Sequence, residues 1–298
     1  MGLRYHLKKR LHLKDASATS RLASKFDRWV WRQRQAALVR SLGIATIVTT
    51  PDIPLMELDL TAFHDAYMYW ELYRRGAYEP ETTVLLRNVL FPGDTFVDVG
   101  ANNGYYSLLA SGKVGPTGTV MSFEPSFRAM ARLLHNRGLL GEGGKNITAF
   151  RYALGDFDGD GLLDDNPAND AWSRLAWQSH ESHDKELSRV GIHRLDSLLP
   201  NTKVVNVAKI DVEGGELDVV RGMQDTIRRS PRIGLIVEWS PDREEAAELF
   251  RVLTEDLGLT VSAIDTVRHE PGYLLRRVQD RKDLDYDTNI WCTKAVGQ

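Results

Sequence analysis

The sequence predicts an α/β fold in which seven strands form one Rossmann-like sheet with helices on both of its faces. Short apolar runs rich in β-forming residues alternate with amphipathic stretches along most of the chain, a pattern typical of doubly wound, mostly parallel sheets. The first such run, residues 94–100, leads into a glycine turn and then a helix. Acidic residues recur at or just beyond the ends of several predicted strands, where open α/β sheets bind their ligands.

The predicted elements follow from periodicity and from turn residues. Residues 59–73 are an aromatic-rich helical or hairpin segment. The seven strands are predicted at residues 94–100, 119–125, 147–153, 204–212, 232–239, 259–264 and 289–294, the last of them antiparallel to its neighbours. Helices are predicted at residues 81–90, 105–111, 126–137, 216–228 and 244–257. The helix at residues 126–137 is expected to carry its apolar residues on one side: Phe127, Met130, Leu133 and Leu134.

We expect two regions, a basic helical extension with its lead-in at residues 1–75 and an α/β domain at residues 76–298. A chain of 298 residues is long enough for a full α/β core. Its hydrophobic content of 42% and charged content of 27% are ordinary for a globular protein. Residues 155–190 interrupt the strand–helix rhythm with a long polar stretch, and long irregular insertions often carry function. We therefore expect this insert to bind the acceptor substrate.

Three features of the sequence favour a cytoplasmic location. No run of 18 or more apolar residues occurs, so no membrane span is predicted. Residues 1–14 alternate leucine with Lys, Arg and His and lack the apolar core of a signal peptide. The lone Cys292 excludes an internal disulfide and fits a reducing compartment.

Charge is distributed unevenly along the chain. Residues 1–40 hold eleven Lys and Arg against two Asp, a balance of +9, and the whole chain carries −3, so residues 41–298 carry −12. With apolar residues interleaved, this basic segment is predicted either to lie on anionic lipid at the inner face of a membrane or to pack as a helical lead-in against the acidic domain. The acidic domain itself disfavours a nucleic-acid partner, because it offers no basic stripe to neutralise phosphates.

The turn after the first strand predicts a cationic ligand. Gly100 and Gly104 can adopt positive φ, and Asn102 is among the few other residues that tolerate a left-handed conformation. Their spacing departs from the Gly-x-Gly-x-x-Gly of nicotinamide sites. Asp98 lies inside the strand, and a carboxylate there opposes a pyrophosphate but suits the ammonium and sulfonium of S-adenosylmethionine (SAM). We therefore expect a SAM site, with a dinucleotide site as the alternative.

Further acidic residues support a negatively lined crevice. Glu124 ends the second strand, 26 positions after Asp98, where an acidic residue in nucleotide-binding folds binds the ribose hydroxyls. Asp211, Glu213 and Glu238 fall on or just past later strand ends. A cationic methyl donor suits such a crevice, and an anionic dinucleotide does not.

Five segments together resemble one protein family. They are residues 96–107, 119–125, 152–156 (Tyr-Ala-Leu-Gly-Asp), 195–199 (Leu-Asp-Ser-Leu-Leu) and 209–216 (Lys-Ile-Asp-Val-Glu-Gly-Gly-Glu), preceded by Gly-Ala-Tyr-Glu-Pro at residues 76–80. In order and in approximate spacing they are similar to the FkbM-type SAM-dependent methyltransferases, over residues 78–239. Two positions depart from the family pattern. Asn103 stands where an aliphatic residue is usual, at no expected cost, and His193-Arg194 replaces a valine–threonine type of pair, which we expect to reshape the acceptor pocket.

The resemblance implies a class I methyltransferase sheet and transfer of a methyl group, often to a hydroxyl of a sugar or a secondary metabolite. It extends the expected SAM-binding set beyond the residues of the turn. The expected donor-binding residues are Glu79, Asp98, Gly100, Asn102, Gly104, Tyr105, Glu124, Pro125, Ala153, Asp156 and Asp211.

Asp211 and Glu213 are the expected catalytic residues. A hydroxyl acceptor must lose its proton, and a carboxylate or histidine within hydrogen-bond reach can accept it. Strand alternation would place both carboxylates on one face. Glu213 is expected on the acceptor side, with Asp211 holding the donor's amino group or orienting the base. The alternative is that Lys209, Asp211 and Glu216 form ion pairs that only fix the turn at residues 214–215.

Other assignments remain open at this point. His180, His183 and His193 are rival bases, since an imidazole has an ordinary pKa near 6.5. Carboxylates at neighbouring strand ends are able to bind Mg²⁺, but we expect no metal. The leading function is a SAM-dependent O-methyltransferase with a sugar, glycan, glycolipid or secondary-metabolite acceptor. The alternatives are a nicotinamide-dependent oxidoreductase or epimerase and a SAM-binding regulator without turnover.

Overall fold

A computed structural model describes residues 45–164, 174–175, 187–266 and 272–294 of the chain. Its core is an eight-stranded sheet with the strand order β13-β12-β14-β11-β10-β3-β4-β5. The strands are β3 (Thr95–Val99), β4 (Thr119–Phe123), β5 (Ile147–Phe150), β10 (Val207–Ile210), β11 (Gly234–Trp239), β12 (Leu259–Thr266), β13 (Tyr273–Arg277) and β14 (Thr288–Lys294). The predicted basic extension at residues 1–40 lies outside the described residues.

Six of the seven predicted strands are present in this sheet as single elements, the third is present only in its first half, and β13 is added at the edge. The five strands from β5 to β11 run parallel, whereas β14 is antiparallel to both β11 and β12, as predicted for the last strand. The predicted α/β fold class is therefore confirmed. β13 lies in a stretch that showed no strand pattern, and its side chains are mostly exposed.

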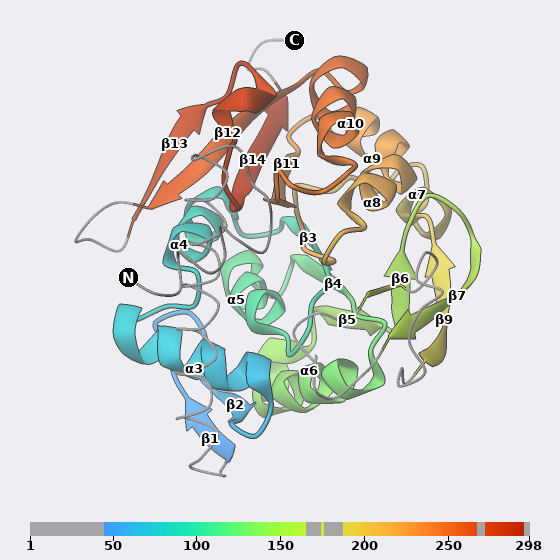
Figure 1. The fold of residues 1–298 in the computed structure, drawn as a ribbon. Coiled ribbons are helices and arrows are strands. Elements are labelled where there is room, and N and C mark those ends of the chain that lie inside the picture. Colours follow the sequence, from blue (N-terminus) through green and yellow to red (C-terminus); the bar gives the residue numbers. More distant parts are fainter. Residues whose placement is uncertain (1–44, 165–173, 176–186, 267–271, 295–298) are drawn as a thin grey trace, which may run out of the picture.

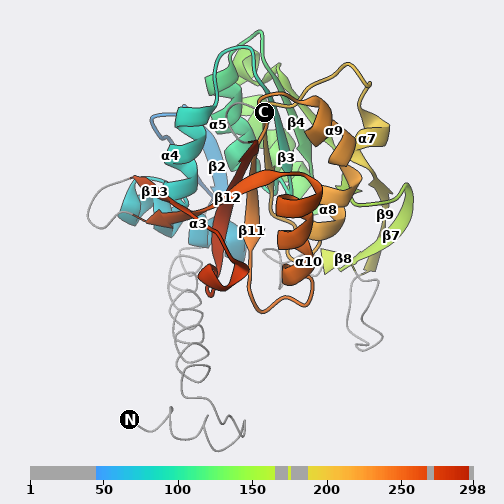
Figure 2. The same cartoon turned by 90° about the horizontal axis from the view of Figure 1, so that it is seen from above.

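Helices cover both faces of the sheet, as Figures 1 and 2 show. On one face lie α3 (Phe63–Arg75), α4 (Pro80–Val89) and α5 (Tyr105–Val114), and on the other lie α8 (Glu216–Gly222), α9 (Gln224–Arg229) and α10 (Ala246–Arg251), which continues as a π-helical turn at Val252–Asp256. Because successive side chains of a strand point to opposite faces of the sheet, one strand contributes to the cores beneath both helix layers. In β3, Phe96 packs with the α3–α5 core and Val97 with the α8–α10 core. The helix predicted at residues 216–228 breaks at Met223 into α8 and α9.

The chain before α4 belongs to the same packed body. A hairpin of β1 (Ala45–Val48) and β2 (Met56–Asp59) precedes α3. Ile53, Met56 and Met68 share a core cluster with Phe96 of β3 and Leu108 of α5. Residues 53–75 are therefore packed into the α/β core, although the sequence suggested a lead-in separate from the domain.

The predicted third strand is wrong as a single element. It divides at Arg151 into β5 and β6 (Tyr152–Leu154), and β6 leaves the large sheet. A second sheet forms with the order β6-β9-β7-β8, from β7 (Gly159–Asp164), β8 (Arg174–Leu175) and β9 (Leu187–His193). The described part of the 155–190 insert is thus largely ordered β-structure. Trp172 and Trp177 lie outside the described residues.

Helix α6 (Phe127–Leu139) has a narrower apolar face than predicted. Met130 and Leu133 are buried, whereas Phe127 is 67% exposed and Leu134 is 46% exposed.

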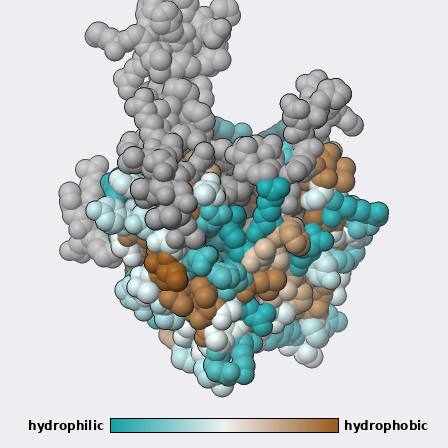
Figure 3. Space-filling view, turned by 90° about the horizontal axis from the view of Figure 1, so that it is seen from below, coloured by the Kyte–Doolittle hydropathy of each residue, from teal (hydrophilic) through white to brown (hydrophobic). Residues whose placement is uncertain are grey.

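On the face of the molecule in Figure 3, hydrophobic residues form separate patches between hydrophilic ones. Within the part of the chain that the structure describes, no helix combines the length and apolarity needed to cross a membrane.

Candidate active site

A buried cluster of charges lies where β3 and β10 run side by side. Asp98 and Lys209 are paired in the ladder, and they are only 1% and 3% exposed. The Lys209 ammonium donates to Asp211 Oδ2 at 2.6 Å and lies over the ring of Tyr106, 4.7 Å from its centroid. Burial opposes its charge, but Asp211, Glu79 and Asp98 together raise the pKa of Lys209. Lys209 is therefore the cation that allows several carboxylates to stay inside the protein.

Asp98 lies in β3, just before the glycine turn. Its Oδ2 accepts a hydrogen bond of 2.6 Å from the Ser107 hydroxyl of α5, and its buried Oδ1 has no hydrogen-bond partner among the described residues. Burial raises the pKa of Asp98, while Lys209 and the Ser107 hydrogen bond oppose that effect. Its expected direct contact with the donor stays a prediction.

The glycine turn presses against the end of β10. Gly100 has φ +78°, and a Cβ there would lie 1.9 Å from the carbonyl oxygen of Asp211. Among the described residues, the non-glycine residues with positive φ are Glu79, Asn102 and Glu213, and all three line one cavity. Backbone conformations of this kind cost free energy and tend to occur at functional sites.

Glu124 organises the turn. Its two carboxylate oxygens accept hydrogen bonds from the backbone N–H groups of Asn102, at 2.9 Å, and Ser126, at 2.8 Å. The turn at Asn102 and the start of α6 are thereby joined through one side chain. The predicted ribose contact of Glu124 is not tested by this geometry.

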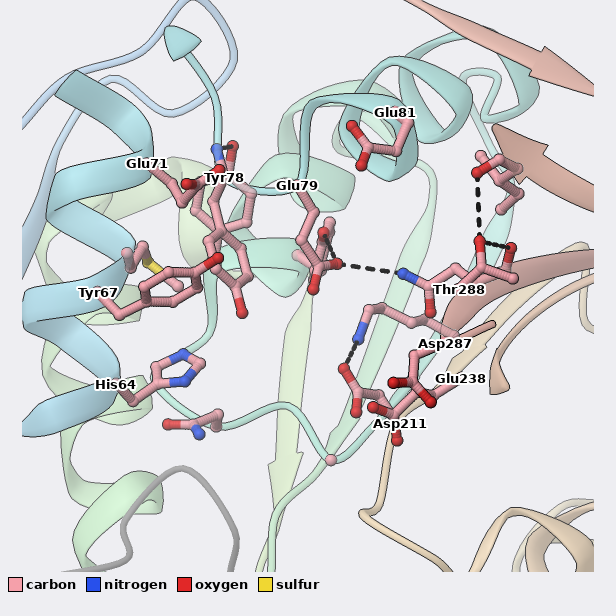
Figure 4. A pocket seen from close by; sticks show the side chains of 18 of the residues that line it. His64, Tyr67, Glu71, Tyr78, Glu79, Glu81, Asp211, Glu238, Asp287 and Thr288 are labelled. Atoms are coloured by element: carbon pink, nitrogen blue, oxygen red, sulfur yellow. Dashed lines mark hydrogen bonds and ion pairs between the residues drawn. The ribbon is translucent and has the colours of Figure 1, made fainter. Parts of the chain in front are cut away.

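The turn, α3 and the strand ends enclose a cavity of about 580 Å³, shown in Figure 4. Six of the predicted site residues line it: Glu79, Gly100, Asn102, Tyr105, Asp211 and Glu213. Its other walls come from α3 and from the ends of β11, β12 and β14. The described cavity thus lies at the carboxyl ends of the parallel strands, as predicted.

The other six predicted residues are not part of this cavity wall. Besides Asp98 and Glu124, these are Gly104, Pro125, Ala153 and Asp156. Gly104 is the N-cap of α5 with φ +92°, and Ala153 is buried in β6 of the second sheet. The structure therefore brings the turn residues and the β10 acids together, and it places the 153–156 segment apart from them.

Glu79 closes the cavity from the start of α4. Its Oε2 accepts hydrogen bonds from the Tyr106 hydroxyl at 2.7 Å and from Asn289 Nδ2 at 3.3 Å. Burial raises the pKa of Glu79, and Lys209 opposes that rise. Glu79 therefore connects α4 and α5 to β14 beside the turn.

The expected catalytic acids lie together, but not for the predicted reason. β10 ends at Ile210, so strand alternation does not extend to Asp211 and Glu213, and Glu213 adopts φ +57°. With Glu238 they form a trio whose carboxylate oxygens lie within 4.8 Å of one another. Burial and the neighbouring carboxylates raise the pKa of Glu238 to about 9.

Arg243 balances much of this charge. Its guanidinium lies 2.7 Å from Glu238 and 3.5 Å from Glu213, and it also pairs with Glu216. Glu216 in turn accepts from the N–H groups of Val212 and Gly214 at 3.2 and 3.1 Å. The ion-pair alternative therefore describes Glu216 well, since this side chain fixes the turn. The expected absence of a metal stays a prediction.

Asn103 has a structural role that the sequence did not indicate. It is buried, and its Nδ2 donates to Asp65 Oδ1 of α3 at 2.7 Å. Asp65 also accepts from the N–H of Asp59 at 2.9 Å. The departure from the family pattern thus ties the cavity wall formed by α3 to the turn.

Replacing Asn103 with leucine is expected to lower the free energy of unfolding by about 1–3 kcal/mol, because the buried Asp65 carboxylate loses a donor. Urea denaturation measures the loss. Asn201→Leu, at an exposed position in a turn, is the control and should change stability by less than about 0.5 kcal/mol. Equal effects of the two substitutions would contradict the structural role of Asn103.

The sequence analysis missed the contribution of α3 to the site. His64, Tyr67, Glu71 and Arg75 recur at helical spacing along one side of α3 and line the cavity. This periodicity was visible in the sequence, but an aromatic-rich segment is more often part of the core.

Of the rival histidines, His193 contacts Asp158 at 3.2 Å and the Tyr152 ring. The expected effect of His193 on the acceptor pocket is therefore not seen in the described cavity. His180 and His183 lie outside the described residues.

The fold is that of a class I methyltransferase, and its cavity lies at the carboxyl ends of the parallel strands. The model of the FkbM methyltransferase domain matches residues 98–260, more than half of the chain, so this chain belongs to the FkbM methyltransferase family. The methyl donor of the family is SAM. Family membership favours the methyltransferase hypothesis over the nicotinamide alternative.

Individual relatives are more distant. The chain is 31% identical over 154 residues to "Methyltransferase 1" of Beauveria bassiana (strain ARSEF 2860), which covers 45% of this chain and 61% of that protein. It is similar to the FkbM methyltransferase structure from Methylobacillus flagellatus KT, with a TM-score of 0.43, 16% identity and coverage of 77% of this chain and 54% of that one. A SAM-dependent O-methyltransferase structure from Thermotoga maritima gives a TM-score of 0.42 and 13% identity, covering 85% of this chain and 86% of that one.

Proposed function

We propose that this protein transfers the methyl group of SAM to a hydroxyl oxygen of a sugar, glycan, glycolipid or secondary metabolite. The observation that carries the proposal is the cavity itself: the glycine turn forms one side, and carboxylates and aromatic residues form the others. The carbohydrate preference rests on the resemblance to the family. A hydroxyl acceptor fits a polar cavity that offers several groups able to bind or accept its proton.

The residues around the turn fit a cationic donor. Glu79, Asn102 and Tyr105 line the cavity beside Gly100, whose lack of a side chain lets the turn pack against the carbonyl oxygen of Asp211. Asp98 supplies further negative charge from behind the turn, and its unpartnered buried Oδ1 is consistent with a site built for a cationic or hydrogen-bonding group. When bound, SAM supplies a methyl group activated by a positively charged sulfur. The residues of the chain hold the two substrates in line and exclude water.

Asp211 and Glu213 are proposed to act on the acceptor side. Although burial opposes it, Lys209 lowers the pKa of Asp211, so this carboxylate stays ionised at neutral pH. An ionised Asp211 is able to orient a hydroxyl or an ammonium in the cavity. Glu213, held by the positive φ of its backbone at the cavity edge, is placed to bind a second acceptor hydroxyl.

The test uses an extract of cells that lack the gene for this protein, supplied with methyl-tritiated SAM and the purified protein. Radioactivity should enter the carbohydrate or lipid fraction, and mass spectrometry of the untreated deletion strain should show a product lighter by one methylene. Asp211→Asn and Glu213→Gln should each lower the initial rate at least about tenfold, equivalent to about 1.4 kcal/mol of the barrier. Glu142→Gln, at a surface ion pair with Lys145, is the control and should keep the full rate.

The non-catalytic alternative makes a different prediction for the same experiment. A SAM-binding regulator would bind SAM in calorimetry, yet no label would reach any acceptor fraction. That result would overturn the proposed function. Label recovered only on nitrogen or carbon atoms would contradict the hydroxyl acceptor while preserving methyl transfer.

A further inference from the structure

His64 stands on the cavity wall that α3 provides. It is the second residue of α3, half-buried, and its ring makes an edge-on contact with Tyr78, with the ring centroids 5.8 Å apart. Figure 4 shows His64 and Tyr67 extending from α3 toward the side of the cavity where Asp211 and Glu238 lie. When it is protonated, the imidazole attracts the Asp211 carboxylate, and this attraction adds to the larger effect of Lys209, which lowers the pKa of Asp211 against the effect of burial. His64 is thus placed between α3 and the end of β10, facing the space available to an acceptor.

The three carboxylates at the ends of β10 and β11 are poorly matched to accept a hydroxyl proton. Asp211 is a weak base because its pKa is lowered by Lys209, to which it is bound at 2.6 Å. Glu238 has its pKa raised to about 9, so near neutral pH it already carries a proton for most of the time. Glu213 lies 3.5 Å from the Arg243 guanidinium. Proton acceptors work best when their pKa lies near the working pH.

A histidine satisfies that requirement by its chemistry. An imidazole has an ordinary pKa of about 6.5 and is largely neutral at pH 7.5. The facing Asp211 carboxylate favours the imidazolium after proton uptake. The titratable and charged groups that share the cavity with His64 come from several elements: Tyr67, Glu71 and Arg75 of α3, Tyr78, Glu79 and Glu81 around the start of α4, Tyr105 and Tyr106 of α5, Lys209, Asp211 and Glu213 at β10, Glu238 of β11, Asp265 of β12, and Tyr286 and Asp287 before β14.

We propose that His64 is the catalytic residue that accepts the proton of the acceptor hydroxyl, with Asp211 stabilising the imidazolium that forms. This inference rests on the proposed function. In the step, the acceptor oxygen forms a bond to the methyl carbon, the carbon–sulfur bond breaks with its electron pair remaining on sulfur, and the hydroxyl proton passes to an imidazole nitrogen. The imidazolium then releases the proton to solvent, so that charge and atoms balance.

His64 lies outside residues 98–260, the part of the chain that matches the family model. The donor turn and the β10 acids lie inside that part, whereas α3 and the segment with Glu79 precede it. The wall of the cavity that carries His64 therefore comes from a part of the chain outside the matched range.

The first test needs no acceptor. Nuclear magnetic resonance of imidazole-labelled full-length protein, with S-adenosylhomocysteine bound, measures the titration midpoint of His64. In Asp211→Asn the midpoint should fall, because the imidazolium loses a facing carboxylate and Lys209 loses its nearest counter-charge. His135 of α6, whose Nε2 lies 3.2 Å from Oε2 of Glu57 in β2, is the control. Its titration midpoint should be the same in the wild type and in Asp211→Asn. An unchanged midpoint for His64 would overturn the pairing with Asp211.

The second test measures methyl transfer to the extract of the deletion strain. His64→Gln should lower the initial rate by about 10²–10⁴-fold, the usual contribution of a proton acceptor, while S-adenosylhomocysteine affinity in calorimetry stays unchanged. The wild-type rate should rise with pH across the midpoint measured for His64, and the variant should lose this rise. His135→Gln is the matched control and should keep both rate and pH profile.

The outcomes separate this inference from the proposed function. Transfer by the wild type with an equal rate in His64→Gln would overturn the role of His64 and leave the methyltransferase proposal intact. No transfer by the wild type would overturn the proposed function. Calorimetric binding by the variant shows that it is folded, and His64→Asn provides a second substitution should glutamine disturb α3.

Discussion

Replacing Lys209 with methionine is expected to lower the free energy of unfolding by about 3–5 kcal/mol near neutral pH, the usual cost of breaking a buried ion pair from one side. Methionine keeps most of the side-chain volume and removes the charge. Asp98, which is buried, and Asp211 and Glu79, which are half-buried at the cavity, are then left without their common cation. Urea denaturation near pH 7.5 measures the loss.

The same substitution predicts a pH dependence. In the wild type, the pKa of Lys209 is raised, so its contribution is complete below its unfolded-state pKa of about 10.4 and is lost only as the pH rises further. In the variant, the carboxylates left behind acquire raised pKa values and bind protons in the folded state. Their penalty is therefore greatest at neutral pH and shrinks as the pH falls toward about 5.

Lys145→Met is the control for this prediction. Lys145 pairs with Glu142 at 2.7 Å, and both side chains are largely exposed. Surface pairs of this kind contribute about 0–1 kcal/mol. A loss for Lys209→Met no larger than that for Lys145→Met, or a loss that does not change between the two pH values, would show that Lys209 does not neutralise the cluster.

Substituting alanine for Gly100 is expected to lower the free energy of unfolding by about 2–5 kcal/mol. About 1–2 kcal/mol comes from the left-handed backbone and about 1–3 from overpacking. The new Cβ would lie 1.9 Å from the Asp211 carbonyl oxygen, so the ends of β3 and β10 must separate. Because the same movement displaces the turn that lines the cavity, SAM affinity measured by calorimetry should fall at least about tenfold, or about 1.4 kcal/mol.

Gly115→Ala separates the two causes. Gly115 also has positive φ, at +66°, but a Cβ there would meet no atom within 4 Å. This control should lose only the backbone contribution of about 1–2 kcal/mol and keep its affinity for SAM. Similar losses of affinity in both variants would mean that the contact between Gly100 and Asp211 does not shape the site.

Local sequence was enough to predict the large sheet, because burial leaves a readable pattern. Residues of β3 and β10 are buried throughout, and such strands read as short apolar runs bounded by turn residues. At residues 147–153 the same pattern led to a wrong prediction of one strand, where the structure has β5 and β6 in two sheets. Both halves of that run are β-forming, and no local feature indicates that the chain changes sheets at Arg151.

The residues of the candidate site likewise fall into those that local sequence predicted and those that it did not. Gly100, Asn102, Asp211 and Glu213 belong to short motifs, so the sequence placed them correctly at strand ends. His64 was treated as one of several aromatic residues in a packed segment. Its access to the cavity depends on Asn103 and Asp65, which fix α3 against the turn through a contact between residues 38 positions apart.

The sequence by itself determined the order of strands and helices, the conformational demand for glycine at the turn, and the family to which the chain belongs. These properties are local, since each depends on a periodicity or a motif within a few residues. The tertiary structure decided which charges meet. Lys209 neutralises carboxylates from three separate segments, and the pKa of Glu238 is raised by burial and by the carboxylates at the end of β10. Coulomb interactions and desolvation depend on distance in space, which separation along the chain does not reveal.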